Sequence, residues 1–349
     1  MLVGLIGATG YTGLELLRLL AQHPRRPEVS VVTSRREAGR ALTDVFPSLA
    51  GLANYDRLVF EDPAGLAGRA EVFFLAAPHG AAQALAPALL DGGAKVIDLS
   101  ADFRLKDPAV FEQWYRQSHA APGLLGQAVY GLPEINGPAL ARARLVANPG
   151  CYPTSAILGL APLLKAGLPD PDWPIIVDAA SGVTGAGRGA LPGVSFCEVS
   201  ESFKAYKVVG HRHTPEMEQE LAVLGGRPLT VAFTPHLAPL NRGILATIYI
   251  RPRGDIPSTE ELRSLYLDFY GAAPFVRVRP PGFEPRTLEV RGTNFCDLSL
   301  FPDPRSGLVK VIVALDNLCR GASGQALANF NLINGWAETE GLMAAPLTP

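Results

Sequence analysis

The N-terminal segment constrains the fold of this chain more than any other part of it. Residues 2–6 form a short apolar run typical of a buried strand, and residues 13–22 carry leucines at helical spacing. Between them stand three glycines, Gly7, Gly10 and Gly13. A glycine turn between a strand and a helix lets the backbone approach a pyrophosphate, which then lies at the helix N-terminus. The sequence therefore predicts a dinucleotide-binding unit here, and the alternative is a glycine-rich turn without a ligand.

The pattern of strands changes at about residue 150. Before it, short strands at 29–33, 71–77 and 95–99 alternate with helices such as 80–91, which predicts a parallel sheet with helices on both faces. After it, the strands are longer and alternate between apolar and polar residues, which favours a mostly antiparallel sheet backed by helices. These later strands are expected at 175–179, 229–235, 243–250, 297–301 and 308–314.

We therefore expect an α/β protein of two domains, in keeping with a length of 349 residues. Residues 1–148 are expected to form the dinucleotide-binding domain, a Rossmann-type doubly wound parallel sheet. A C-terminal helix within about 316–349 is expected to complete that domain. Residues 149–315 are expected to form an α+β domain for catalysis and dimerisation.

Charge and cysteine usage exclude several classes of protein. The chain has 31 Lys and Arg against 33 Asp and Glu, a net charge of −2, so no basic field is available for nucleic acid. No apolar run is long enough to span a membrane, and no targeting segment is evident. The four cysteines are far apart and lack metal-binding spacing, which suits reduced thiols. We expect a cytoplasmic protein with no membrane, nucleic-acid or metal partner.

The residues after the second predicted strand bear on which dinucleotide is bound. NAD enzymes carry an Asp or Glu there, which binds the ribose hydroxyls. This chain has Ser34, Arg35 and Arg36 instead. A hydroxyl and guanidinium groups suit a 2′-phosphate, which a carboxylate would repel. The sequence predicts NADP(H), and the alternative is that the arginines are solvated surface residues.

Cys151 is the strongest candidate for a catalytic group. It follows a Pro-Gly pair and precedes an apolar run of helical spacing, so it is expected at or just before a helix N-terminus. There, unpaired backbone N–H groups and the positive end of the helix dipole favour the thiolate, which is the nucleophilic form. The alternative is a small buried hydrophobic residue, an interpretation that suits Cys197, Cys296 and Cys319.

Residues 204–216 supply a partner for the thiol. They hold two histidines among lysine and arginine residues, and Thr214 followed by a proline is typical of a helix N-cap. His211 and His213 then lie in the loop before the helix, where an imidazole of near-neutral pKa moves protons. Glu216 would orient one of them or act only on the helix dipole. Two histidines at this spacing also suit a metal, but no third ligand is evident in the sequence.

Two further segments carry cations suited to an anionic substrate. Residues 181–189 form a flexible glycine-rich loop with Arg188 near its end, able to fold over such a substrate. Residues 98–107 follow a strand C-terminus, where open α/β sheets bind ligands, and Arg104 there would bind a phosphate or carboxylate. The alternative for Arg104 is a structural ion pair with Asp102 or Asp107.

Six motifs in order along the chain resemble the N-acetyl-gamma-glutamyl-phosphate reductase family. They are Gly7–Gly13 (GATGYTG), Ala101–Arg104 (ADFR), Asn148–Thr154 (NPGCYPT), Ser181–Arg188 (SGVTGAGR), Gly210–Glu216 (GHRHTPE) and Gly292–Phe295 (GTNF). The resemblance covers essentially the whole chain, and its cysteine and histidine motifs are specific. Relatives often carry Ser and Gly where this chain has Thr184 and Val209, and neither position touches the expected chemistry.

The resemblance implies a glyceraldehyde-3-phosphate-dehydrogenase-like catalytic domain in a homodimer or homotetramer. It implies NADPH-dependent reduction of N-acetyl-L-glutamyl 5-phosphate, through a cysteine thioester, to N-acetyl-L-glutamate 5-semialdehyde and phosphate, in arginine biosynthesis. Cys151 corresponds to the family's nucleophile and His211 to its acid/base, with His213 and Glu216 as possible support. The expected substrate ligands are Arg104, Asn148, Ser181, Arg188, Tyr206 and Arg212. The expected cofactor ligands are Gly7, Thr9, Gly10, Tyr11, Thr12, Gly13, Ser34, Arg35, Arg36, Pro78, Ser100, Gly182 and Asn317.

Three other functions remain open at this point. Aspartate-semialdehyde dehydrogenase catalyses the same chemistry on a shorter substrate, but its cysteine motif lacks the Pro-Gly pair. Reductases of aminoadipyl or glutamyl phosphate bound to a carrier protein have a cysteine loop that resembles Gly-Cys-Asn, whereas residues 150–154 read Gly-Cys-Tyr-Pro-Thr. A non-catalytic NADP-binding sensor would not need Cys151, His211 and Arg104 together.

Overall fold

The computed structural model describes residues 1–189 and 192–347, which form two compact units. The first unit contains Met1–Pro149, Gly187–Gly189 and Ala322–Met343. The second contains Gly150–Ala186, the chain from residue 192 to Gly321, and the segment that begins at Ala344. The division falls at Gly150, one residue before the predicted nucleophile.

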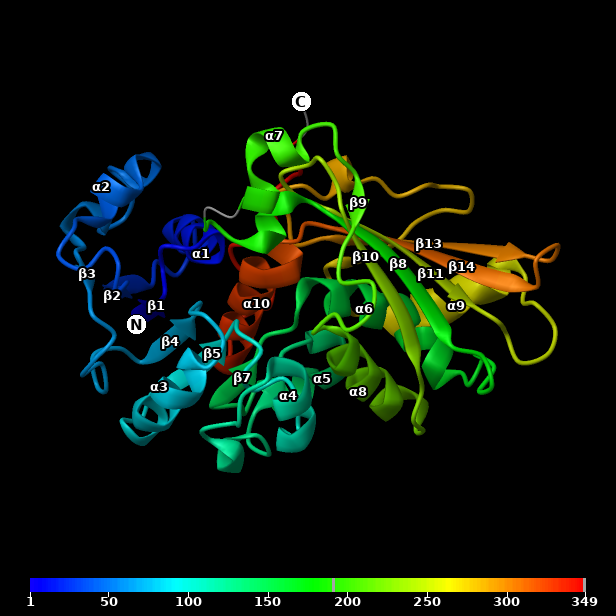
Figure 1. The fold of residues 1–349 in the computed structure, drawn as a ribbon, viewed down its shortest axis with the longest axis horizontal. Helices are drawn as coiled ribbons and strands as arrows, with labels where there is room; N and C mark the ends of the chain where they lie inside the picture. The colour runs from blue at the N-terminus through cyan, green and yellow to red at the C-terminus, as the bar shows by residue number, and fades with distance from the viewer. Residues whose placement is uncertain (190–191, 348–349) are drawn as a thin grey trace. The chain divides into compact units, whose positions relative to one another are not determined.

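The first unit is built on a seven-stranded parallel sheet in the order β3-β2-β1-β4-β5-β7-β6 (Figure 1). Chain order reverses between β1 and β4, as in a doubly wound fold, so the predicted parallel sheet is confirmed. The strands are β1 (Leu2–Ile6), β2 (Glu28–Thr33), β3 (Phe60–Glu61), β4 (Val72–Leu75), β5 (Lys95–Asp98), β6 (Val129–Tyr130) and β7 (Leu145–Ala147).

Helices cover this sheet, and one of them comes from near the end of the chain. This helix is α10 (Gly324–Ile333), and two residues of the N-terminal part of the chain bind it. His23 Nε2 lies 2.9 Å from Asn331 Oδ1, and Lys95 donates to the Ile333 carbonyl at 2.5 Å. The predicted C-terminal helix is shorter than expected, because a π-turn (Cys319–Ser323) precedes α10. The other helices are α1 (Tyr11–Ala21), α2 (Leu42–Val45), α3 (Ala81–Asp91), α4 (Pro108–Tyr115) and α5 (Pro133–Leu140), with short 3-10 turns at Pro47–Leu49, Tyr55–Arg57 and Pro122–Leu124.

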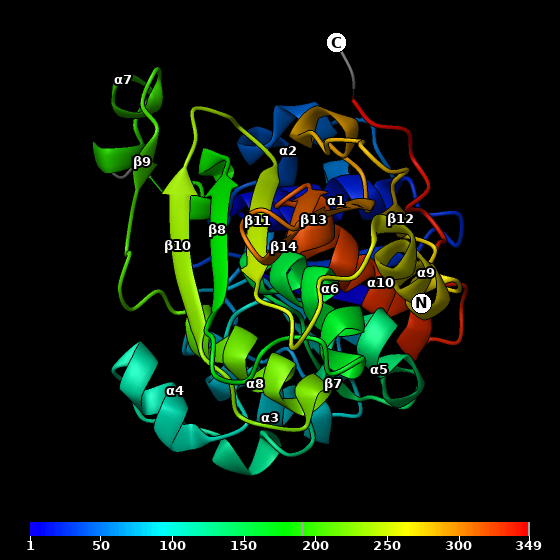
Figure 2. The ribbon, with the colours of Figure 1, turned by 90° about the vertical axis from the view of Figure 1, so that its right-hand side faces the viewer.

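The second unit contains a mixed seven-stranded sheet in the order β12-β13-β14-β11-β8-β10-β9. Four of its neighbouring pairs are antiparallel and two are parallel, as the alternating pattern predicts. Figure 2 shows β11, β8 and β10 side by side. The strands are β8 (Ile175–Ser181), β9 (Lys204–Ala205), β10 (Val231–Leu237), β11 (Ile244–Ile250), β12 (Val276–Val278), β13 (Cys296–Asp303) and β14 (Leu308–Leu315).

The helix α6 (Cys151–Lys165) packs directly on this sheet. A Cβ atom at Gly159 would lie 2.5 Å from Ile248 Cδ1, so the contact with β11 requires a residue without a side chain. Two tyrosines of α9 (Thr259–Tyr270) donate to α6 carbonyls, Tyr266 to Gly159 and Tyr270 to Leu158. The remaining helices are α7 (Phe196–Val199) and α8 (Thr214–Gly225), with 3-10 turns at Val183–Ala186, Pro192–Val194 and Thr287–Glu289. Within the described residues, no helix is long and apolar enough to cross a bilayer.

Candidate active site

Cys151 is the first residue of α6 and is partly exposed, which confirms the predicted helix start. The N-cap Gly150 supplies no side-chain hydrogen bond, and the first turn holds no acidic residue. The N-terminal amides and the positive end of the helix dipole therefore favour an anion at Cys151. The Gly150 amide donates to Glu216 Oε1 at 2.8 Å, and Glu216 is 1% exposed. Glu216 thus fixes the backbone immediately before the nucleophile.

Both predicted histidines lie beside the first turn of α6. The Tyr152 ring is 5.7 Å from His211 and 6.0 Å from His213, and the two imidazoles are 4.9 Å apart. The prediction of Thr214 as an N-cap is wrong by one residue. The helix begins at Thr214 itself, so its N-cap is His213, whose φ of −82° and ψ of −11° are already in the helical region.

His211 is a neutral imidazole whose tautomer is fixed by the backbone. The His213 amide donates to His211 Nδ1 at 3.1 Å, so Nδ1 is an acceptor and the proton of the neutral ring lies on Nε2. Burial, followed by the charges of Lys207 and Arg212, lowers the pKa of His211 to about 4. Nε2–H is therefore the donor that this ring can offer to a ligand.

The phenols of Tyr152 and Tyr206 form the apolar wall of the histidine cluster. Tyr206 donates to the Tyr152 hydroxyl at 3.1 Å, and the Tyr206 ring lies 5.7 Å from His211. Burial raises the pKa of Tyr206 to about 12 and that of Tyr152 well above its ordinary range. Both hydroxyls stay protonated at neutral pH, so this pair of phenols carries no charge beside His211.

The start of the glycine-rich loop after β8 is held by the backbone of residues 241–243. Gly182 donates to the Gly243 carbonyl at 2.9 Å, and a Cβ at Gly182 would lie 2.7 Å from the Asn241 backbone. Thr184 donates through its hydroxyl to the Asn241 carbonyl at 2.6 Å. The hydroxyl of Ser181, which is 2% exposed, donates to the Gly182 carbonyl. The sequence predicted a flexible loop, but close backbone approach orders residues 181–184.

A turn at residues 316–321 contacts the nucleophile from the other side. The buried Asp316 carboxylate accepts from three amides, those of Gly292 at 2.6 Å and of Leu318 and Cys319 at 2.8 Å. The Gly321 amide donates to the Asp316 carbonyl at 2.9 Å. A Cβ at Gly321 would lie 2.7 Å from Cys151 Cβ, so this turn presents a bare backbone to the nucleophile.

Asn317, an expected cofactor ligand, belongs to the same turn. Its Oδ1 accepts from the Gly243 amide at 2.8 Å, and its Nδ2 donates to the Thr184 hydroxyl at 3.0 Å. The side chain therefore ties the turn to the glycine-rich loop, and one Nδ2 hydrogen is left for a ligand.

In the first unit, the glycine turn has the geometry that a pyrophosphate needs. Gly7 has φ +77°, and a Cβ there would lie 2.7 Å from the Ala76 carbonyl oxygen. A Cβ at Gly13 would lie 2.4 Å from the Ala8 carbonyl oxygen, whereas one at Gly10 would meet nothing within 4 Å. The first turn of α1, which includes Tyr11 and Thr12, has no acidic residue and no side-chain cap. An uncapped helix N-terminus with open space beside Gly10 fits a dinucleotide phosphate.

The other expected cofactor residues of the first unit lie at the carboxyl edge of its sheet. Ser34 Oγ lies 3.4 Å from Thr9 Oγ1, directly after β2. Arg35 is exposed, while Arg36 forms an ion pair with Glu37 at 3.4 Å.

Pro78 is exposed after β4, and Ser100 follows β5. The Ser100 hydroxyl donates to Asp98 Oδ2 at 3.0 Å. Burial, followed by the charge of Asp102, raises the pKa of Asp98 to about 7.

Arg104 and Asn148 are buried, and both make hydrogen bonds inside the first unit. Arg104 Nε donates to the Asn148 carbonyl at 2.8 Å, and its Nη2 donates to the Leu99 carbonyl at 3.0 Å. Asn148 is 1% exposed, donates through Nδ2 to the Ala322 carbonyl and accepts at Oδ1 from Asn329. These bonds fix the segment before Cys151, whereas the sequence predicted that both side chains bind substrate.

Arg188 belongs to the first unit with residues 187–189, whereas His211 and His213 belong to the second. Arg188 Nη1 donates to the Thr9 carbonyl at 3.2 Å, on the glycine turn.

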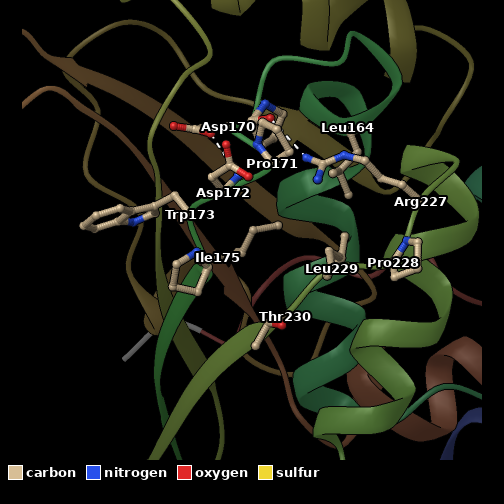
Figure 3. A pocket seen from close by; sticks show the side chains of 12 residues that line it. Leu164, Asp170, Pro171, Asp172, Trp173, Ile175, Arg227, Pro228, Leu229 and Thr230 are labelled. Atoms are coloured by element: carbon tan, nitrogen blue, oxygen red, sulfur yellow. Dashed lines mark hydrogen bonds between the residues drawn. The ribbon is translucent and has the colours of Figure 1, made fainter.

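A hollow of about 370 Å³ lies at the far end of α6 from Cys151. Its lining includes Leu164, Asp170, Trp173 and Arg227, and Figure 3 shows these side chains around the starts of β8 and β10. Thirteen helical residues separate Cys151 from Leu164, a rise of about 20 Å, so this hollow is not part of the catalytic site. In the described part of the chain, no cluster of three or more His, Cys, Asp or Glu residues suits a metal ion.

Comparison with known proteins assigns the family. The family models described as "Semialdehyde dehydrogenase, NAD binding domain" and "Semialdehyde dehydrogenase, dimerisation domain" match residues 2–143 and 151–317. N-acetyl-gamma-glutamyl-phosphate reductases from Desulforudis audaxviator (55% identity) and Symbiobacterium thermophilum (52%) align over 99% of this chain and of their own length. The chain belongs to the N-acetyl-gamma-glutamyl-phosphate reductases of the semialdehyde dehydrogenase family. The resemblance predicted from the six motifs is confirmed, and the chain is an oxidoreductase with a nicotinamide cofactor.

Solved structures share the fold. Aspartate semialdehyde dehydrogenase II from Vibrio cholerae superposes with a TM-score of 0.73 at 16% identity, over 96% of this chain and 98% of its own. The Candida albicans enzyme gives a TM-score of 0.66 at 15% identity, over 97% and 99%. At these identities the likeness shows the fold alone, and it confirms the Rossmann-type unit joined to a mixed-sheet unit.

Sequence reasoning missed several residues of the site. Lys207 acts on the pKa of His211 and has an unusual φ of +44°. Asp316 and Gly321 form the turn behind Cys151, and Arg242 Nη1 lies 3.6 Å from Asp316 Oδ2. Lys207 stands within the quoted histidine segment, so its position was a usable signal. The other three are brought to the site by tertiary contacts that no local pattern announces.

Proposed function

We propose that this chain reduces N-acetyl-L-glutamyl 5-phosphate to N-acetyl-L-glutamate 5-semialdehyde and phosphate, with NADPH, in arginine biosynthesis. The observation that carries the proposal is a partly exposed cysteine at a helix N-terminus beside a neutral imidazole. The curated relatives at 52–55% identity bear the name of that activity. The Gly-Cys-Tyr-Pro-Thr loop supports the free acetylated substrate over a carrier-bound one.

The chemistry begins with the Cys151 thiolate, which attacks the acyl carbon and expels phosphate to give a thioester. Covalent catalysis is useful here because a thioester carbonyl accepts a hydride, whereas a carboxylate resists it. The nicotinamide cofactor, when bound, supplies that hydride. His211 Nε2 then protonates the oxyanion of the resulting thiohemiacetal and takes the same proton back as the carbonyl re-forms and the C–S bond breaks, which releases the aldehyde and restores the Cys151 thiolate. Arg212, Tyr206 and Ser181 are the proposed substrate ligands on this unit, and His213 remains a second candidate for the proton transfer.

The proposal of NADPH over NADH depends on the end of β2. Ser34, at hydrogen-bonding distance from Thr9, and the exposed Arg35 offer a hydroxyl and a cation where NAD enzymes carry a carboxylate. Arg36 is engaged with Glu37, which leaves Arg35 as the proposed guanidinium for a 2′-phosphate. The fit of the cofactor to the glycine turn is supported by the open space at Gly10.

The proposed assembly is a homodimer or homotetramer in the cytoplasm. The second unit matches a family model named for dimerisation, and exposed apolar side chains such as Leu245 lie on its sheet. All four cysteines are free thiols, which supports a reducing compartment.

The reverse reaction provides the test. The purified chain is assayed with phosphate, NADP⁺ or NAD⁺, and either N-acetylglutamate 5-semialdehyde or aspartate semialdehyde. We expect kcat/KM to favour the acetylated substrate by at least about 10²-fold, because substrate-specific contacts are lost with the shorter one. Cys151→Ala should retain cofactor binding and lose turnover. A preference for aspartate semialdehyde, or substantial turnover by Cys151→Ala, would contradict the proposal.

A further inference from the structure

Arg188 makes its contacts within the dinucleotide unit. The sequence suggested that Arg188 closes over the substrate near Cys151, but residues 187–189 belong to the dinucleotide unit. Its Nη1 donates to the Thr9 carbonyl at 3.2 Å, and its guanidinium carbon lies 4.7 Å from the centre of the Phe46 ring. A hydrogen bond to the glycine turn and a cation–π contact with Phe46 therefore position Arg188.

The surroundings of this guanidinium suit an anion. Phe46 is buried, with 3% exposure, so its ring is a rigid face for the planar cation. Among the described residues no carboxylate pairs with Arg188, which donates to the Thr9 carbonyl and lies over the Phe46 ring. One hydrogen bond uses one of the five guanidinium N–H donors, so four others are available.

The turn that Arg188 contacts is the place where a dinucleotide brings its phosphates. Thr9 lies between Gly7 and Gly10, and the first turn of α1 begins at Tyr11 without a cap or an acidic residue. On its other side, Thr9 Oγ1 lies 3.4 Å from Ser34 Oγ, at the end of β2. A guanidinium on the Thr9 carbonyl thus stands between the pyrophosphate position and the 2′-phosphate position.

We infer that Arg188 is a cofactor ligand that binds a phosphate of the dinucleotide, in place of the substrate role that its sequence position suggested. This inference requires the nicotinamide cofactor of the family and rests on the proposed function only in the choice of NADPH. The glycine-rich loop then serves two ligands: Ser181–Thr184 stays near the nucleophile, while Gly187–Gly189 belongs to the cofactor unit. A charge-assisted hydrogen bond from a planar guanidinium gives both charge and direction to that contact.

The test measures cofactor binding without substrate, from the change in nicotinamide fluorescence on titration of the full chain. Arg188→Gln should raise the dissociation constant by about 10- to 10²-fold, the usual effect of losing a hydrogen bond to a charged group. Arg188→Lys keeps the charge without the fork and should recover part of the loss. Arg142→Gln, an exposed arginine of the same unit, is the matched control and should bind cofactor as the unaltered chain does.

Parallel titrations with NADPH and NADH separate the two phosphates. A loss confined to NADPH assigns Arg188 to the 2′-phosphate, and an equal loss for both cofactors assigns it to the pyrophosphate. The inference is overturned if Arg188→Gln binds both cofactors normally, including the case in which only the KM for phosphate or semialdehyde rises. Because no substrate is present in the titration, a wrong substrate assignment would leave this result unaffected.

Discussion

A single methyl group at Gly321 tests whether the turn behind Cys151 positions the nucleophile. In Gly321→Ala the new Cβ would lie 2.7 Å from Cys151 Cβ and 3.2 Å from its Cα, where ordinary contact begins at 3.4 Å. The overlap is about 0.7 Å at the closer atom, and one of the two segments must move. Displacement of reacting groups by about 1 Å costs roughly 10²-fold in rate.

The structure indicates that the displacement falls on the cysteine. The turn is held by the Gly321 amide at 2.9 Å from the Asp316 carbonyl and by three amides on the Asp316 carboxylate. Cys151, in contrast, begins its helix and is partly exposed, so its side chain has room to shift. We expect kcat to fall by about 10²-fold, equivalent to about 2.7 kcal/mol. Cofactor affinity should stay unchanged, because the glycine turn belongs to the other unit.

The assay combines turnover in the reverse direction with the rate of Cys151 alkylation by iodoacetamide. Gly225→Ala is the matched control, because its Cβ would meet only Leu164 Cδ2, at 3.4 Å. Unaltered turnover and alkylation in Gly321→Ala would refute the reasoning. If that variant is too unstable to assay, Cys151→Gly removes the clashing Cβ, so Cys151→Gly/Gly321→Ala should recover the lost thermal stability. Failure to recover it would equally refute the contact.

Two further predictions concern the groups around the nucleophile. Glu216→Ala leaves the Gly150 amide without its buried acceptor and should lower the free energy of unfolding by about 1–3 kcal/mol. Glu216→Gln keeps an acceptor and should lower it much less. Equal losses of the two variants in denaturant titrations would contradict this. Lys207→Met removes a cation that lowers the pKa of His211, so that pKa should rise from about 4. Semialdehyde oxidation needs the neutral imidazole, so the acid limb of its kcat/KM profile should move to higher pH. The exposed Lys204→Met is its control, and an acid limb that does not move in Lys207→Met would show that this charge does not act on the base.

Features with a local cause could be predicted from the sequence. The strand, glycine turn and helix at residues 2–21 follow from periodicity and three glycines, and the structure gives Gly7 and Gly13 a steric reason. The helix start at Cys151 follows from a Pro-Gly pair before an apolar run. The N-cap before α8 was wrong by one residue, because helix ends depend on dihedrals that several neighbouring residues can adopt.

Features with a tertiary cause could not be predicted. Arg104 has the sequence position of a ligand, but burial turns its donors to the Asn148 and Leu99 carbonyls. Asp316 carries no motif, because its partners are backbone amides of loops that meet only in the folded unit. Arg188 ends a motif that begins in the second unit, yet its side chain donates to the Thr9 carbonyl of the first. Residue type and spacing do not indicate which backbone carbonyl will accept a hydrogen bond from a given arginine.

The low pKa of His211 belongs to the site without substrate, and this resolves its apparent conflict with proton donation. Burial destabilises the imidazolium, and the positive charges of Lys207 and Arg212 add to that effect. An acyl phosphate brings negative charge to the same two cations, and a nearby anion favours the protonated ring. The anionic substrate therefore raises the pKa of His211, so that the protonated ring becomes more populated than in the empty site. Because Nδ1 accepts from the His213 amide, the proton of the neutral ring lies on Nε2, and Nε2 is the atom that can donate it to the reacting oxygen.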